Sequence, residues 1–214
     1  MRGTALVTGF EPYGGRDLNP SGELAAALDG ARIGDLAIVG RTLPVVFAGL
    51  APRIAACLAE TRPALVIALG LWPGEAAIRL EGRAVNRAEC SSPDNAGALR
   101  HGEALEPSGA AALAATLPLP AIAAALLADG IPARLSDSAG TFLCNATLYT
   151  LLHAIARSGA RIPCGFIHLP YLPRQVAAML AGGGARDGEL ASMDLGTMER
   201  AVRIALAVTA SAPA

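Results

Sequence analysis

The chain has 214 residues, of which 53% are hydrophobic and 16% are charged, and its formal net charge is −1. This composition excludes a disordered chain and indicates a single domain, residues 1–214, with a large core. The near-zero net charge gives no indication of binding to nucleic acid or to an acidic membrane surface. All 17 basic residues are arginine, which excludes chemistry that needs a lysine Schiff base or a P-loop lysine.

The first part of the chain alternates apolar runs of strand length with helical patterns. Asn19 followed by Pro20 is typical of an N-cap with proline at the first helical position. The continuous apolar run at 63–70 is typical of a strand that is covered on both faces. We expect strands at 4–10, 36–45, 63–70 and 76–86, and helices at 20–28 and 47–60.

The alternation resumes after an irregular segment. Residues 87–119 are rich in Pro, Gly, Ser and Asp, so we expect an excursion on one edge, with a small helix at 108–116 as an option. Further helices are expected at 121–130, from Cys144 onward, at 174–182 and from near Asp194 to 210, with strands at 131–136 and 164–172. This order, without an internal repeat, predicts an α/β/α sandwich around a mainly parallel, mixed central sheet.

The four cysteines form no Cys-x-x-Cys pair and no dense framework, which is typical of free thiols in a reducing compartment. The apolar run at the N-terminus is too short to span a membrane and lacks a signal-peptide cleavage pattern. We therefore expect a cytoplasmic protein. A free cysteine is most often core filler, and we interpret Cys57 and Cys164 in this way, while Cys90 receives no role.

Cys144 has a different setting. The segment SDSAGT before it supplies small residues and a glycine, which let the backbone approach a ligand closely. Leu148, Leu151 and Ile155 then recur at helical spacing, so the thiol belongs to the first turn of a helix. Such a turn stabilises a thiolate, and its N–H groups can hold an oxyanion. Two interpretations remain, a nucleophile or a small core residue.

A cysteine nucleophile needs a base, and the chain has three histidines. His101 lies in a polar loop segment, and His153 lies too far along the helix to touch Cys144. His168 ends a strand, where the carboxyl ends of parallel strands line the ligand crevice. Glu81 lies in an apolar strand context and needs a partner. That partner is either a histidine across the crevice or a nearby arginine, and the spacing does not decide between them.

Five segments carry a family resemblance: VTGFEPYGGRDLNPS, LEGRAVN, PDNAG, LSDSAGTFLCNATLY and GFIHLPYLP. Together they resemble the pyroglutamyl peptidase I (pyrrolidone-carboxylate peptidase) family of cysteine peptidases. The resemblance implies a triad of Glu81, Cys144 and His168, a thioester intermediate, and no metal or other cofactor. It also implies peptide substrates with a blocked, pyroglutamyl N-terminus, and a homodimer or homotetramer.

The resemblance also implies a pocket for the flat, neutral lactam of pyroglutamate, with aromatic walls and an amide partner. A pocket of this kind imposes a desolvation penalty on a cationic N-terminus. The residues that the resemblance places there are Phe10, Tyr13, Asn19, Leu71, Phe142 and Leu143. The alternatives are a core role for the two phenylalanines, a loop aromatic for Tyr13 and a helix cap alone for Asn19.

Three departures from the family pattern fall around this pocket. The family's glycine loop usually contains Gly-Gln-Ala and then Gly-Gly-Arg, whereas GLWPGEAA stands at 70–77. An arginine and a bulky apolar residue usually precede PDN, whereas Ser91 and Ser92 stand here. Tyr13 replaces the commoner phenylalanine and adds a hydroxyl that needs a partner. The alternative hypotheses are a cysteine amidase or peptidase with a remodelled acyl pocket, a non-catalytic binding homologue, and a nucleoside phosphorylase-like enzyme, for which there is no phosphate-binding signature.

Overall fold

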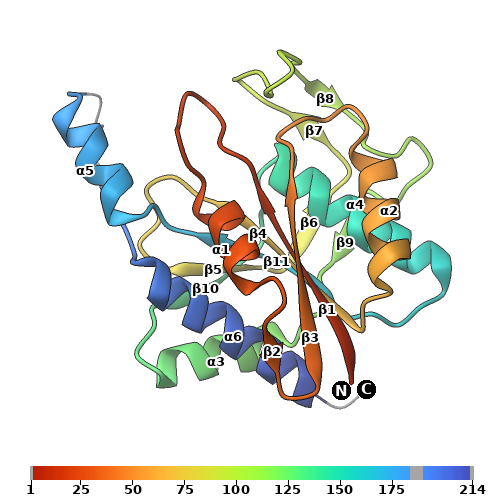
Figure 1. Ribbon diagram of the computed structural model, residues 1–214. Coiled ribbons are helices and arrows are strands. Elements are labelled where there is room, and N and C mark those ends of the chain that lie inside the picture. Colours follow the sequence, from red (N-terminus) through yellow and green to blue (C-terminus); the bar gives the residue numbers. More distant parts are fainter. Residues whose placement is uncertain (1, 184–189, 213–214) are drawn as a thin grey trace.

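The computed structural model describes residues 2–183 and 190–212. A seven-stranded sheet lies at the centre, in the order β10-β5-β11-β4-β1-β3-β2 (Figure 1). Its strands are β1 (Gly3–Phe10), β2 (Arg32–Ile33), β3 (Leu36–Leu43), β4 (Leu65–Leu71), β5 (Ile78–Glu81), β10 (Ala133–Ser136) and β11 (Cys164–Leu169). The pairings are parallel except for β2 with β3 and β5 with β11. The predicted α/β fold with a mainly parallel, mixed sheet is confirmed.

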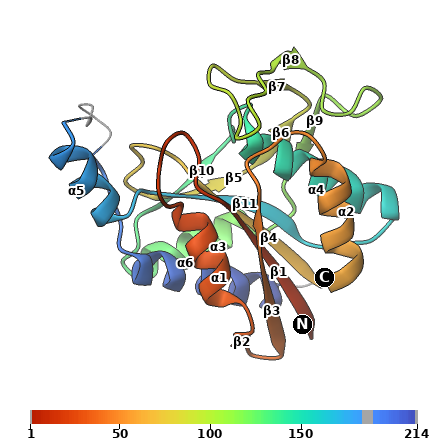
Figure 2. The same cartoon turned by 45° about the horizontal axis from the view of Figure 1, so that its top comes forward.

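Helices cover both faces of this sheet (Figures 1 and 2). One face carries α1 (Pro20–Leu28), α3 (Leu119–Ala128) and α6 (Leu195–Ser211), and the other carries α2 (Leu50–Thr61) and α4 (Leu143–Ser158). Helix α5 (Pro173–Ala181) projects away from the sheet in both views. Across the described ranges, no helix has the length and apolar character needed to cross a membrane.

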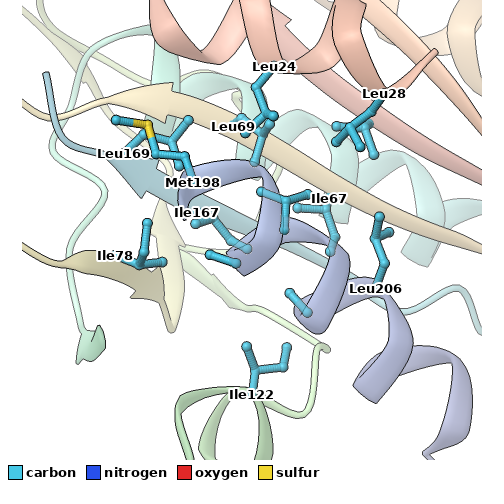
Figure 3. Packing of buried hydrophobic residues seen from close by; sticks show 14 of the residues in the cluster. Leu24, Leu28, Ile67, Leu69, Ile78, Ile122, Ile167, Leu169, Met198 and Leu206 are labelled. Carbon is cyan, nitrogen blue, oxygen red and sulfur yellow. The ribbon is translucent and has the colours of Figure 1, made fainter. Parts of the chain in front are cut away.

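The alternation of side chains along the strands divides the interior into two cores. On β4, Ile67 and Leu69 enter the core with α1, α3 and α6, part of which is drawn in Figure 3. Val66 and Ala68 enter the core with α2 and α4. On β11, Ile167 likewise lies in the first core and Phe166 in the second. By the same period of two, His168 shares the α4 face of the sheet with Phe166.

The segment 87–119 forms an excursion, but the optional helix at 108–116 is wrong. Residues Ala112–Ala114 form β9, which pairs antiparallel with β6 (Arg83–Val85), and β7 (Ala88–Glu89) pairs with β8 (His101–Glu103). The side chain of Asn145 bonds both backbone groups of Val85 and so ties β6 to α4. Tertiary pairing therefore overrides the helix propensity of the alanine run.

The two-core arrangement gives a stability prediction. Leu206 on α6 is fully buried, whereas Leu180 on α5 is 57% exposed. We expect Leu206→Ala to lower the free energy of unfolding by about 2–5 kcal/mol, because it leaves a cavity. The matched change Leu180→Ala should lower it by less than about 0.5 kcal/mol. Urea denaturation followed by circular dichroism measures both, and equal losses would contradict this assignment of the core.

Candidate active site

Cys144 lies in the first turn of α4. Phe142 occupies the N-cap position in an extended conformation, and no side chain caps the helix. The N–H groups of its first turn are therefore not occupied by a capping side chain. The chain before the helix is held by reciprocal bonds between Thr141 and Glu89, from the Glu89 N–H to the Thr141 carbonyl and from the Thr141 hydroxyl to the Glu89 carbonyl.

The thiol of Cys144 fills space that is free because β4 carries a glycine, Gly70, at this position. Gly70 is the register partner of His168 in the parallel pairing of β4 with β11. A Cβ atom on Gly70 would lie 2.8 Å from Sγ of Cys144 and 2.7 Å from Cζ of Phe166. The sulfur therefore packs directly over the strand position next to the imidazole. The structure thus brings the cysteine and the histidine to the same patch of the sheet.

Glu81 and His168 form a buried pair. Oε1 of Glu81 lies 2.7 Å from Nδ1 of His168, and their side chains are 0% and 1% exposed. The same oxygen accepts a bond of 3.0 Å from Nε of Arg79. Both partners considered for Glu81, the histidine and an arginine, are therefore present at once. Because Nδ1–H donates to the carboxylate, Nε2 remains as the acceptor that can take a proton.

Burial sets the resting protonation states. It raises the pKa of Cys144 to about 12, and the charge of Glu81 adds to this rise. Burial also lowers the pKa of His168 and outweighs the opposing effect of Glu81. The pKa of Glu81 falls in spite of burial, because His168 and Arg79 stabilise its charge. The expected thiolate at the helix N-terminus is therefore not the resting state, which is a neutral thiol beside a neutral imidazole and an ionised carboxylate.

A cavity of about 1160 Å³ opens over the start of α4. Tyr13 and Phe142 line it, with ring centroids 6.2 Å apart, and Phe47 packs edge-on against Phe142 at 5.5 Å. Ser91 and Ser92 line it as well. Two cations, Arg16 and Arg100, are also part of the lining. The cavity therefore has aromatic walls and contains positive charge from Arg16 and Arg100. The arginine that usually precedes the PDN motif is missing, because Ser91 and Ser92 stand there.

Comparison with known proteins decides the family. A family model described as pyroglutamyl peptidase matches residues 4–212. The chain belongs to the pyroglutamyl peptidase family. It is 44% identical to a pyrrolidone-carboxylate peptidase of Cupriavidus pinatubonensis over 96% of this chain and 92% of the relative. A pyrrolidone-carboxylate peptidase of Pyrococcus furiosus is 40% identical, over 94% and 97%. A solved mutant structure of the Pyrococcus furiosus pyrrolidone carboxyl peptidase superposes with a TM-score of 0.92 at 39% identity, covering 97% of this chain and 98% of that one.

For this member of the pyroglutamyl peptidase family, the predicted pocket residues separate into two groups. Tyr13 and Phe142 line the cavity, whereas three others, Phe10, Leu71 and Leu143, are 1–4% exposed and pack into hydrophobic clusters. The Tyr13 hydroxyl is the group for which a hydrogen-bond partner is expected. Burial disfavours the ionised form of this phenol and so raises the pKa of Tyr13.

Asn19 caps α1 as expected, and this role occupies most of its amide. Its Oδ1 accepts from both the N–H and the hydroxyl of Ser21, and its Nδ2 donates to the carbonyl of Glu11. One amide N–H remains for a ligand. Any contact between Asn19 and a lactam would have to use that hydrogen.

The sequence interpretation missed the surroundings of the Glu81–His168 pair. Trp72, noted only as a departure from the family pattern, packs edge-on against His168 with ring centroids 4.9 Å apart. Arg79 was not singled out, although the period of two on a strand puts it on the same face as Glu81. Among the residues that the structure describes, no group of three or more His, Cys, Asp or Glu side chains could hold a metal ion.

The contact between Gly70 and the thiol can be tested by adding one methyl group. We expect Gly70→Ala to lower kcat by about 100-fold, because the methyl group must displace Cys144 or Phe166. Gly182→Ala is the matched control, since the nearest atom to a Cβ there lies at 3.4 Å. Release of a fluorescent amine from a pyroglutamyl amide measures both. An active Gly70→Ala variant would contradict the placement of the sulfur.

The resting protonation states predict the dependence on pH. Turnover needs a neutral imidazole, and burial lowers the pKa of His168 from its ordinary value of 6.5. We therefore expect the acid limb of kcat/KM below pH 6.5. With the thiol pKa near 12, alkylation of Cys144 by iodoacetamide should keep rising across the alkaline range. A plateau in the alkylation rate near neutral pH would indicate a preformed thiolate–imidazolium pair and contradict this state.

Proposed function

We propose that this member of the family removes N-terminal pyroglutamyl residues from peptides with Cys144 as nucleophile, His168 as proton carrier and Glu81 as the group that orients the imidazole. The reaction itself, removal of a pyroglutamyl residue, is inferred from membership of the pyroglutamyl peptidase family. The observation that carries the roles is the buried bond of 2.7 Å between Glu81 and Nδ1 of His168, next to the thiol that packs on Gly70.

Proton transfer accompanies attack in this mechanism, because the thiol and the imidazole are both neutral at rest. Nε2 of His168 takes the thiol proton as Sγ of Cys144 bonds to the acyl carbon. Glu81 stabilises the imidazolium that forms and fixes its orientation. The imidazolium then protonates the leaving amine, whose bond to the acyl carbon breaks. Water then gives a proton to Nε2 of His168 as its oxygen bonds to the thioester carbon. The C–S bond breaks, pyroglutamate is freed, and the imidazolium returns the proton to the sulfur of Cys144.

The oxyanion of each tetrahedral intermediate needs donors that are already oriented. The first N–H groups of α4 have no side-chain cap, and they lie at the positive end of the helix dipole. We assign them this task, with the N–H of Leu143 or Cys144 as the nearest candidates. This is the role that the pocket residue Leu143 retains, since its side chain is buried in the core.

The acyl pocket is proposed between Tyr13 and Phe142. Their rings are the aromatic surface of the cavity, and Phe47 supports Phe142 from behind. A flat lactam has a neutral N–H and C=O in place of a cationic amine, so an apolar slot favours it by the difference in desolvation. The backbone of Leu71 and the remaining amide N–H of Asn19 are the proposed polar partners. Phe10 supports the wall from the core.

Cellular location and assembly are further parts of the proposal. The four cysteines are free thiols, which suits the cytoplasm.

On α5, only Gln175 and Val176 are buried, and Leu180 is exposed on a helix that projects from the sheet. That apolar surface supports a homodimer or homotetramer. We also propose that residues 1–214 form one domain, because the family match runs through 4–212.

The roles predict the outcome of single cysteine changes. We expect Cys144→Ala to lower turnover of a pyroglutamyl amide by at least about 1,000-fold, the scale at which removal of a nucleophile acts. Cys57→Ala is the matched control, because Cys57 lies on α2 as a partly exposed free thiol. It should retain wild-type turnover under reducing conditions.

A substrate panel separates the proposal from a remodelled acyl pocket. Turnover of a prolyl or short acyl amide in preference to the pyroglutamyl amide would refute the substrate assignment while leaving the nucleophile. No turnover of any amide by folded, reduced protein would refute the catalytic assignment.

A further inference from the structure

Arg79 is a buried arginine next to the Glu81–His168 pair. It lies on β5 two residues before Glu81, and its side chain is 9% exposed. In the antiparallel pairing of β5 with β11, it stands directly opposite His168. It is not among the residues that line the cavity over α4. Its side chain bonds Glu81, so we expect it to act on the reaction through the Glu81–His168 pair.

None of the described polar partners of the Arg79 guanidinium is among the residues that line the cavity. Nε donates to Oε1 of Glu81 at 3.0 Å, and Nη2 donates to the Ser136 hydroxyl at 2.8 Å and the Ser138 carbonyl at 2.9 Å. Nη1 lies 3.6 Å from Oε2 of Glu75. The guanidinium is thus fixed by β10, by the turn that follows it and by the loop between β4 and β5.

Trp72 completes this arrangement. Its ring lies 3.8 Å from the Arg79 guanidinium and packs edge-on against His168. A cation over an indole face is the most favourable of the cation–π pairs. Trp72 and Glu75 belong to the loop GLWPGEAA that departs from the family pattern. Two residues of this altered loop therefore meet at a single side chain, Arg79.

Glu81 depends on Arg79 for its orientation. Oε2 of Glu81 has no hydrogen-bond partner among the described residues, so Oε1 makes the bonds to both His168 and Arg79. Without Arg79, the buried carboxylate would keep the bond to the imidazole that it must orient and the stabilising effect of the nearby Ser136 hydroxyl, but would lose its charged donor. The planar guanidinium of an arginine is preorganised, so it loses less rotamer freedom per hydrogen bond formed than a lysine ammonium does.

We propose that Arg79, held by Trp72, Glu75 and Ser136, is a positioning residue that fixes Glu81 against His168 and balances the charge of the pair. This inference rests on the proposed catalytic roles of Glu81 and His168. It adds a residue that neither touches the substrate nor reacts, and it gives the altered GLWPGEAA loop a function in the site.

The charges around His168 set the sign of the effect. The groups that face it are Glu81 and Arg79 on β5, Glu75 on the loop before β5 and the thiol of Cys144 on α4, with the phenol of Tyr13 next to that thiol. The cation of Arg79 disfavours the imidazolium, and the two carboxylates favour it. Removal of Arg79 therefore makes both His168 and Glu81 easier to protonate.

The test compares Arg79→Met with Arg79→Lys and with Arg134→Met. Arg134 bonds the same Glu75 at 2.5 Å but lies half-exposed on β10, so its loss controls for the removal of a neighbouring cation. We expect Arg79→Met to lower kcat by about 10- to 100-fold, the scale on which loss of an outer hydrogen-bond partner acts at metal-bound histidines, with KM little changed. The acid limb of kcat/KM should move to higher pH. Arg79→Lys should restore the limb and part of kcat, and Arg134→Met should change neither.

A merely structural role would lower activity at every pH and leave the limb in place. An unmoved limb in folded Arg79→Met, or a loss equal to that of Arg134→Met, would overturn the proposal. If Arg79→Met does not fold, Glu75→Gln carries the test, because it removes an anion that favours the imidazolium. Its acid limb should move to lower pH, and an unmoved limb would overturn the role of charge.

The failure of this proposal can be told apart from the failure of the catalytic roles. An NMR titration of His168, assigned with a His168 variant, follows the imidazole without any turnover. A raised pKa of His168 in Arg79→Met supports the charge balance even where Cys144→Ala keeps activity and the nucleophile is wrong. An unchanged pKa, together with loss of turnover in Cys144→Ala, rejects Arg79 alone.

Discussion

The antiparallel pairing of β5 with β11 is the constraint on which the site depends. The other long strands of the central sheet pair in parallel, and parallel strands bring their carboxyl ends to one edge. Because β5 runs the other way, its last residue, Glu81, stands opposite Phe166 rather than at the open edge beside His168. The carboxylate is therefore fully buried, and it reaches the imidazole along the diagonal of the pairing.

A buried carboxylate carries a large desolvation cost, and removal of either partner would leave the charge uncompensated. Arg79 is the direct register partner of His168 and offsets that cost from the strand that also carries the charge. The pairing of β5 with β11 thus brings Glu81, Arg79 and His168 together. The same register fixes Gly70 next to His168 and leaves the space that the thiol fills. Asn145, next to Cys144, ties the first turn of α4 to β6 through two bonds to the backbone of Val85, and a third bond reaches the carbonyl of Arg87 just beyond that strand.

The sequence was sufficient to predict elements whose ends are set by residues close in the chain. The cap at Asn19, the start of α6 after Asp194 and the strand ending near His168 follow from capping chemistry and apolar runs. The helical first turn at Cys144 followed from the spacing of leucines. The direction of β5 could not be predicted, because only tertiary pairing decides it. The role of Arg79 depends on that direction, and β9 depends on pairing with β6, so both were beyond the sequence.

The raised pKa of Cys144 follows from the same tertiary arrangement. A helix N-terminus favours a thiolate locally, but burial and the charge of Glu81 act against it and are stronger here. A thiol that stays neutral is slow to react with oxidants and alkylating agents, since the thiolate is the nucleophile. The proton must then leave during attack on the substrate carbonyl, and its transfer depends closely on the distance and angle between sulfur and imidazole. We therefore expect the groups that fix this geometry to matter for the reaction. Gly70 leaves the space for the sulfur, Asn145 ties the first turn of α4 to the backbone at Val85 and Arg87, and Arg79 bonds Glu81.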